Sequence, residues 1–110
     1  DCLFLNVWTP ENAREGDKLP VLVYIHGGGF TGGCGHEKHF DGPLWPKHGV
    51  IGVTLNYRLG PMGFLCLPEL KEEAGYTGNY GLFSDCGGTV KNLILAGSSL
   101  ALLMLMMGVM

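Results

Sequence analysis

The feature that most constrains the fold of this sequence is an apolar run followed by one histidine and three consecutive glycines. Residues Val21–Ile25 are continuous and rich in β-forming side chains, as expected of a strand covered on both faces. His26 follows, and then Gly27, Gly28 and Gly29. Consecutive glycines leave backbone N–H groups bare, and such groups can stabilise the oxyanion that forms during acyl transfer. The pattern therefore predicts a strand followed by a loop of hydrogen-bond donors.

Three other apolar runs indicate strands, at residues 3–8, 50–57 and 93–96. The first run alternates, so we expect two faces, with Leu3, Leu5 and Val7 on one and Phe4, Asn6 and Trp8 on the other. The polar residues 10–18 predict a surface loop between the first two strands and favour an antiparallel pair. Buried runs separated by glycine-rich loops favour an α/β sheet.

Two segments carry helix signals. Residues Pro68–Ala74 begin with proline and are followed by Gly75, which predicts one or two helical turns. Residues 100–110 are almost purely apolar, and we expect them to form a helix buried in something larger. Because they are well short of the ~20 residues that span a bilayer, they predict no transmembrane segment. We interpret the sequence as a piece of a longer chain.

Composition narrows the possible functions. The 110 residues carry 7 Lys and Arg against 10 Asp and Glu, and this mild acidity argues against a nucleic-acid partner. The four cysteines are too widely spaced for a CxxC redox pair. Their number fits disulfides and buried free thiols equally well. They are Cys2, Cys34, Cys66 and Cys86. The cysteines therefore do not indicate whether the protein lies in an oxidising or a reducing compartment.

A dinucleotide cofactor is the first competing interpretation of the glycine loop. Gly27, Gly29 and Gly32 match the pattern G-x-G-x-x-G after a strand. That pattern also needs a helix that opens at the loop and an acidic residue at the end of the next strand. The loop continues through residues 33–35 without helical periodicity, and the next run ends at residues 56–57, Asn and Tyr. We therefore predict no cofactor.

Zinc is the second competing interpretation. Cys34, His36 and His39 lie close together in the sequence. The two histidines are one residue short of the H-E-x-x-H spacing, so they would not share a helical face. Two solvated loop histidines and a small buried thiol explain the pattern better, and we predict no metal.

The residues around Ser99 match the nucleophile elbow G-x-S-x-G, except that Ala101 replaces the last glycine. The elbow needs small residues two places either side of the serine, and alanine adds only one methyl group. By register, Ser99 is the candidate nucleophile and Ser98 is not. The alternative is that both serines cap the apolar helix expected after them.

Together these segments resemble the type-B carboxylesterases, the family that includes the cholinesterases. The matching segments, in the family's order, are residues 1–8, 19–26 running into 27–30, 56–60 and 78–82. The resemblance is close over residues 1–83 and resumes from Gly87. It implies a partial α/β-hydrolase fold over residues 1–110, ending at the nucleophile elbow, and hydrolysis of a small-molecule carboxylic ester through an acyl-enzyme. It also implies an oxyanion hole made by the N–H groups of Gly28, Gly29 and Leu100.

The sequence departs from the family pattern in several places. Cys2 matches a cysteine that pairs with one further upstream in the family. Arg58 matches an arginine that pairs with an aspartate, but Ser84 takes that place and Asp85 follows one position later, which leaves the ion pair open. Between Phe83 and Gly87 most of a family helix is missing, so we expect the sheet to lack part of its helical cover. Ser98 replaces the usual glutamate.

The catalytic triad is the largest departure. In this fold its order is Ser, then Asp or Glu, then His, but no acidic residue or histidine follows Ser99. The four histidines all precede it, and His26 suits a structural role better than that of a base; they are His26, His36, His39 and His48. We therefore expect this polypeptide alone to be inactive. A non-catalytic adhesion protein of the cholinesterase-like type is the alternative. Family analogy favours a secreted or lumenal location and leaves the oligomeric state open.

Overall fold

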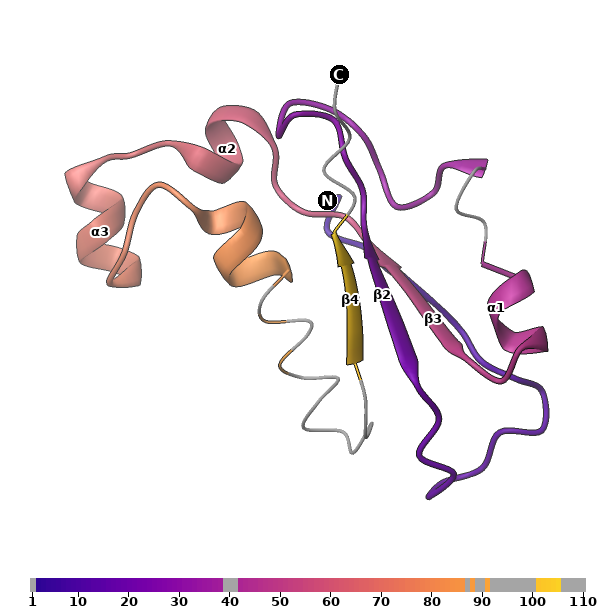
Figure 1. Cartoon of the computed structure of the whole chain (residues 1–110). Coiled ribbons are helices and arrows are strands. Elements are labelled where there is room, and N and C mark those ends of the chain that lie inside the picture. The colour runs from indigo at the N-terminus through magenta and orange to yellow at the C-terminus, as the bar shows by residue number, and fades with distance from the viewer. Residues whose placement is uncertain (1, 39–41, 87, 89–90, 92–100, 106–110) are drawn as a thin grey trace.

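The computed structural model describes residues 2–38, 42–86, 88, 91 and 101–105. Four strands form one sheet in the order β1-β3-β2-β4 (Figure 1). Their bounds are β1 (Leu5–Trp8), β2 (Val21–Ile25), β3 (Ile51–Leu55) and β4 (Ala101–Leu105). Strands β2, β3 and β4 run parallel, and β1 runs antiparallel to β3. The prediction of an α/β sheet is confirmed.

The predicted pairing of the first two strands is wrong in one respect. β1 and β2 run in opposite directions, but β3 lies between them and pairs with both. Strands in a sheet lie about 4.8 Å apart, so the polar loop of residues 10–18 is long enough to reach past one strand. A loop of that length therefore does not determine whether β1 and β2 are neighbours. The continuous apolar run of β3 lies between them.

The predicted helix at residues 100–110 is also wrong where the structure describes it. Residues Ala101–Leu105 form β4, which pairs with β2 from Val21 opposite Ala101 to Ile25 opposite Leu105. A short apolar run does not distinguish a buried strand from a buried helix by periodicity. The backbone groups along β2 need partners, and a fourth strand supplies them. The strand predicted at residues 93–96 lies outside the described residues.

The core lies on one face of the sheet. Val23 of β2 and Val53 of β3 face each other across the ladder and are both fully buried. Their face carries most of the buried apolar cluster, which is Val21, Val23, Ile25, Val53, Leu55, Tyr57 and Cys86. The same face continues onto β1, where Leu5 and Val7 pair with Leu55 and Val53. Leu5 and Val7 are each 50% exposed, so the residues that bury the core do not extend over β1.

The opposite face packs against the short helix α1 (Leu44–Lys47). The ring of Trp45 lies over Gly52 of β3, where a Cβ atom would overlap it. Trp8 of β1 meets Trp45 edge to face, with ring centroids 6.1 Å apart. Glycine inside a strand normally weakens it. At Gly52 it is explained by the close approach of the Trp45 ring.

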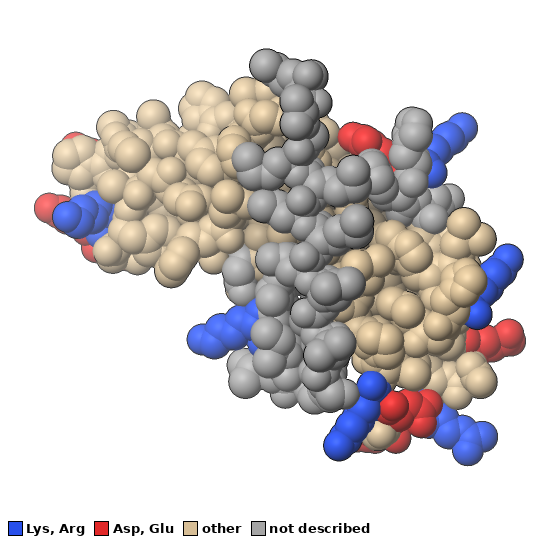
Figure 2. Space-filling view, in the orientation of Figure 1, with Lys and Arg blue, Asp and Glu red and all other residues tan. Residues whose placement is uncertain are grey.

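Three further helices of the described residues lie together on the side of the sheet opposite α1 (Figure 1). They are α2 (Gly60–Phe64), α3 (Pro68–Ala74) and η2 (Tyr80–Cys86), the last a π-helix. The bounds of α3 are those predicted, and Gly75 ends it in the left-handed region at φ 79°. No helix in the described part of the chain is long and apolar enough to cross a membrane. On the face in Figure 2, charged side chains are spread along the periphery.

Candidate active site

The glycine loop follows β2 and has an unusual backbone. Gly28, Gly29 and Phe30 all have positive φ, at 122°, 59° and 63°. A Cβ atom on Gly28 would collide with the backbone of Gly32, so only glycine fits there. A Cβ atom on Gly29 would meet no atom within 4 Å. The two glycines are therefore needed for different reasons, the first for space and the second for backbone conformation alone.

The carbonyl oxygen of Gly28 is fixed by three donors. The N–H groups of Thr31 and Gly32 donate to it over 3.1 and 3.2 Å, and the Thr31 hydroxyl donates over 3.1 Å. The C=O and N–H of a trans peptide point in opposite directions. The N–H of Gly29 belongs to the same peptide unit as this carbonyl. It therefore points away from the three donors that hold the turn.

The N–H groups of Gly28 and Gly29 donate to no group within the described ranges of the chain. Both residues are exposed at the surface. Two adjacent, unpaired and accessible amides form an arrangement that can bind an oxygen carrying negative charge. This is the chemistry that the sequence predicts for the loop.

Phe30 anchors the loop to the helical group. Its positive φ costs a residue with a side chain about 1–2 kcal/mol, and the neighbouring structure has to hold it there. The Phe30 carbonyl accepts a 2.7 Å hydrogen bond from the N–H of Gly60, at the start of α2. Its ring packs on Phe64 at the other end of α2, with centroids 5.0 Å apart. Helix α2 therefore fixes the far side of the loop.

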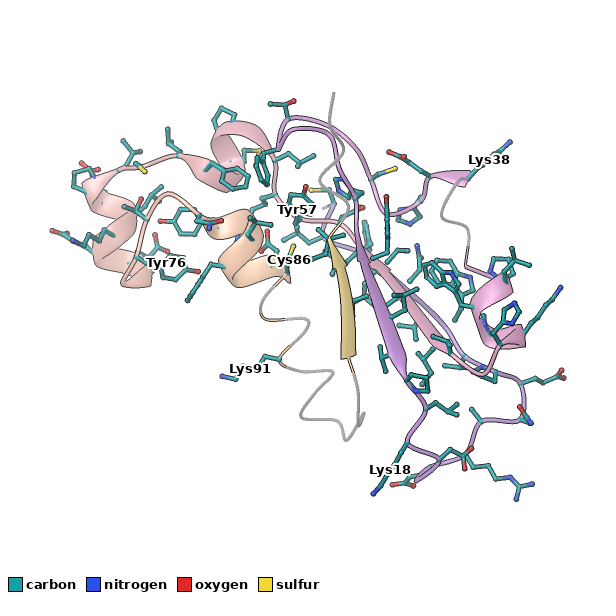
Figure 3. The ribbon with its side chains drawn as sticks, in the orientation of Figure 1. Lys18, Lys38, Tyr57, Tyr76, Cys86 and Lys91 are labelled. Atoms are coloured by element: carbon teal, nitrogen blue, oxygen red, sulfur yellow. The ribbon has the colours of Figure 1, made fainter. Side chains whose placement is uncertain are left out.

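Tyr57, just beyond β3, ties the near side of the loop to the sheet. Its hydroxyl donates to the carbonyl of His26 over 2.9 Å, and the two rings stack with centroids 4.6 Å apart. His26 is 3% exposed, which fits the structural role expected for it. Figure 3 shows Tyr57 between the sheet and the helical group. Burial raises the pKa of the Tyr57 hydroxyl, with a smaller contribution from Cys86, so the hydroxyl remains a donor.

Arg58 and Asp85 form the ion pair that the sequence left open. Arg58 Nη2 lies 2.8 Å from Asp85 Oδ1, and its Nε and backbone N–H both donate to Asp85 Oδ2. Asp85 lies one position later than the family spacing expects. It lies in the π-helix η2, whose wider turn accommodates one more residue than an α-helical turn. From this helix the Asp85 carboxylate reaches Arg58.

The structure does not describe every predicted site residue. Ser99 and Leu100 lie outside the described residues, as does His39 of the zinc interpretation. Ala101, two residues after Ser99, pairs with Val21 at the amino end of β2, whereas the glycine loop follows its carboxyl end. The loop beyond Gly29 forms turns up to residue 36, and no helix opens there. All four cysteines are free, and Cys2 is exposed.

Sequence reasoning missed the residues that support the loop. Thr31 holds the loop through its N–H and hydroxyl groups, and Phe30 holds it through its carbonyl group at a positive φ, for which a non-glycine residue gives no sequence signal. Tyr57 belongs to the family-like segment 56–60, but its hydrogen bond to His26 depends on how β2 and β3 pair.

The comparison with protein families decides the assignment. The sequence model described as "Carboxylesterase family" matches residues 1–86. The chain belongs to the carboxylesterase family. A fumonisin B1 esterase of Sphingopyxis macrogoltabida is 48% identical over 84 residues, which cover 74% of this chain and 15% of that protein. A para-nitrobenzyl esterase of Bacillus subtilis (strain 168) is 49% identical over 86 residues, covering 77% of this chain and 17% of that protein.

Solved structures of carboxylesterases share the fold. The carboxylesterase EST55 of Geobacillus stearothermophilus matches with a TM-score of 0.66 and 41% identity, over 78% of this chain and 19% of that one. The described sheet with its few helices is therefore a partial α/β-hydrolase fold. The chain spans less than a fifth of the length of each of these relatives.

Proposed function

We propose that this chain supplies the oxyanion loop of a serine carboxylic ester hydrolase that acts through an acyl-enzyme. The support is the pair of exposed N–H groups of Gly28 and Gly29 after β2, which have no hydrogen-bond partner among the described residues and are held from both sides by Tyr57 and Phe30. In a water-poor site, each such donor contributes roughly 3–4 kcal/mol to the tetrahedral transition state. The substrate is a small-molecule carboxylic ester.

Ser99 is the proposed nucleophile, and the N–H of Leu100 is the proposed third donor. A base takes the Ser99 hydroxyl proton as the serine oxygen attacks the ester carbonyl carbon, and the carbonyl oxygen takes up the negative charge. The ester C–O bond then breaks, and the alcohol leaves with that proton as the acyl-enzyme forms. The attack needs a base, and no histidine follows Ser99 in this sequence. Removal of the base lowers turnover by about a millionfold, which the oxyanion donors do not compensate. The 110-residue polypeptide therefore hydrolyses nitrophenyl esters at the background rate.

A chimera tests the role of the loop. Residues 1–86 of this chain replace the matching segment of the Bacillus subtilis para-nitrobenzyl esterase, whose remaining residues complete the site. We expect the chimera to hydrolyse a nitrophenyl ester. In Gly28→Ala the added Cβ atom overlaps the Gly32 backbone and displaces the residue 28 N–H, so we expect kcat to fall by about 10²–10³-fold, as loss of one donor does. Gly49→Ala is the control for alanine at a positive-φ glycine outside the loop, because Gly49 has φ 73° and, unlike Gly28, open space around it. Equal loss in both variants would count against the loop.

A non-catalytic binding protein is the second candidate, and the position of β4 favours it. The expected elbow has a helix after the serine, but β4 begins at Ala101, level with the amino end of β2. Nuclear Overhauser contacts between Val21 and Ala101 in solution would favour the binding protein. Their absence, or ester turnover by this polypeptide that Ser99→Ala abolishes, would favour the enzyme; that turnover would also refute the inactivity proposed here.

A further inference from the structure

Among the described residues, one hydrogen bond of the side chain holds the His26 ring in its orientation. Its Nδ1 lies 2.8 Å from the carbonyl oxygen of Gly27. A carbonyl oxygen only accepts hydrogen bonds, so Nδ1 carries the proton. The other ring nitrogen, Nε2, is buried and has no hydrogen-bond partner within the described residues. The polar contact of the imidazole with the described chain is therefore made through Nδ1.

The Gly27 carbonyl shares its peptide unit with the N–H of Gly28, the first proposed oxyanion donor. In a trans peptide these two groups point in opposite directions, and no peptide bond of the described chain is cis. When the carbonyl is held towards the buried imidazole, the N–H is directed to the other side of the loop. We infer that His26 is a positioning residue that fixes the direction of the Gly28 N–H. This inference rests on the proposed function for its catalytic meaning.

The surroundings of the imidazole make this orientation rigid. Tyr57 stacks on one face of the ring, with an interplanar angle of 21°, and its hydroxyl holds the backbone of His26. Gly33 packs so close that a Cβ atom there would overlap Nδ1. A ring confined in this way holds the Gly27 peptide with little freedom to rotate. Preorganised donors of this kind need no reorientation during the reaction.

The same geometry separates positioning from proton transfer. A general base must reach the reacting hydroxyl directly or through one water. His26 is 3% exposed, its Nδ1 is occupied by Gly27, and its Nε2 is enclosed. His26 therefore acts on the reaction through the Gly28 amide and does not contact the substrate.

Two substitutions distinguish the nitrogen atoms. The side-chain amide nitrogen of asparagine takes the place of Nδ1, whereas that of glutamine takes the place of Nε2. In ¹⁵N NMR spectra of this chain, we expect His26 as the Nδ1–H tautomer. We expect the Gly28 amide resonance to stay close to its wild-type position in His26→Asn and to move in His26→Gln. Unchanged amide resonances of β2 and β3 control for the fold.

An Nε2–H tautomer in the wild-type chain would overturn the inference, and so would equal displacement of the Gly28 resonance in both variants. If the variants do not fold, the wild-type tautomer alone decides. These spectra need no esterase activity, so they decide the inference independently of the chimera that tests the proposed function. In that chimera, with Gly28→Ala as reference, His26→Asn should retain more kcat than His26→Gln at unchanged KM.

Discussion

Arg58 donates to the Asp85 carboxylate through its backbone N–H, its Nε and its Nη2. The side chain of Asp85 is 9% exposed and that of Arg58 is 33% exposed, so the pair is only partly screened by water. The Arg58 guanidinium also lies over the ring of Tyr80, 5.5 Å from its centroid. The pair thus fixes η2 against the segment that follows β3.

Substitution of Asp85 by asparagine should lower the free energy of unfolding by about 1–3 kcal/mol. The amide of asparagine turns a donor towards Arg58 or loses one acceptor, and hydrogen bonds to charged groups carry energies of this size. Urea unfolding followed by circular dichroism measures the change. Glu72→Gln, which removes an exposed carboxylate from α3, is the matched control and should change stability by less than about 0.5 kcal/mol. A loss no larger than the control's would show that the pair does not stabilise the fold.

Alkaline pH should destabilise the chain through Cys86. Burial, with a smaller effect of Asp85, raises the pKa of its thiol from 9.0 to about 12. The unfolded state therefore releases this proton from about pH 9, whereas the folded state keeps it until about pH 12. Stability is fully present below pH 9 and falls by on the order of 1 kcal/mol per pH unit above it. Thermal unfolding at pH 8 and pH 10.5 measures the fall, which Cys86→Ser should reduce. An equal fall in both proteins would refute this assignment.

Thiol reactivity should separate the cysteines by position. Cys2 and Cys66 are exposed and Cys86 is buried, and the thiolate is the reactive form. At pH 8, Ellman's reagent should react with Cys2 and Cys66 within minutes and with Cys86 only after denaturant is added. Mass spectrometry of the labelled peptides identifies each site. Early labelling of Cys86 would mean that η2 does not cover it in solution.

Alanine at the two loop glycines should have unequal effects. Gly29→Ala keeps a backbone that alanine adopts at a cost of about 1–2 kcal/mol, and the space around it is open. Gly28→Ala adds overlap with the Gly32 backbone at a φ of 122°, and should cost about 3 kcal/mol or more. The difference in urea midpoint between the variants measures this. Equal midpoints would show that the turn rearranges around the new methyl group.

The sequence predicts those parts of the fold that depend on local signals. The bounds of β2 follow from one continuous apolar run, and those of α3 from a proline start and a glycine stop. The strand at Ala101–Leu105 could not be predicted, because its five residues are apolar without a period and pairing with β2 decides their conformation. The site divides in the same way. Gly28 and Gly29 are evident in the sequence, whereas the supports from Tyr57, Thr31 and Phe30 arise from tertiary contacts.

β1 lies at one border of the described sheet, with Leu5 and Val7 carrying the apolar face of the core out to solvent. Association of two copies of the chain at this border would shield these side chains from water. The melting temperature should therefore rise with protein concentration. The same exposed side chains should also keep the solubility of the chain low. Polar substitutions at these two positions would weaken both trends together.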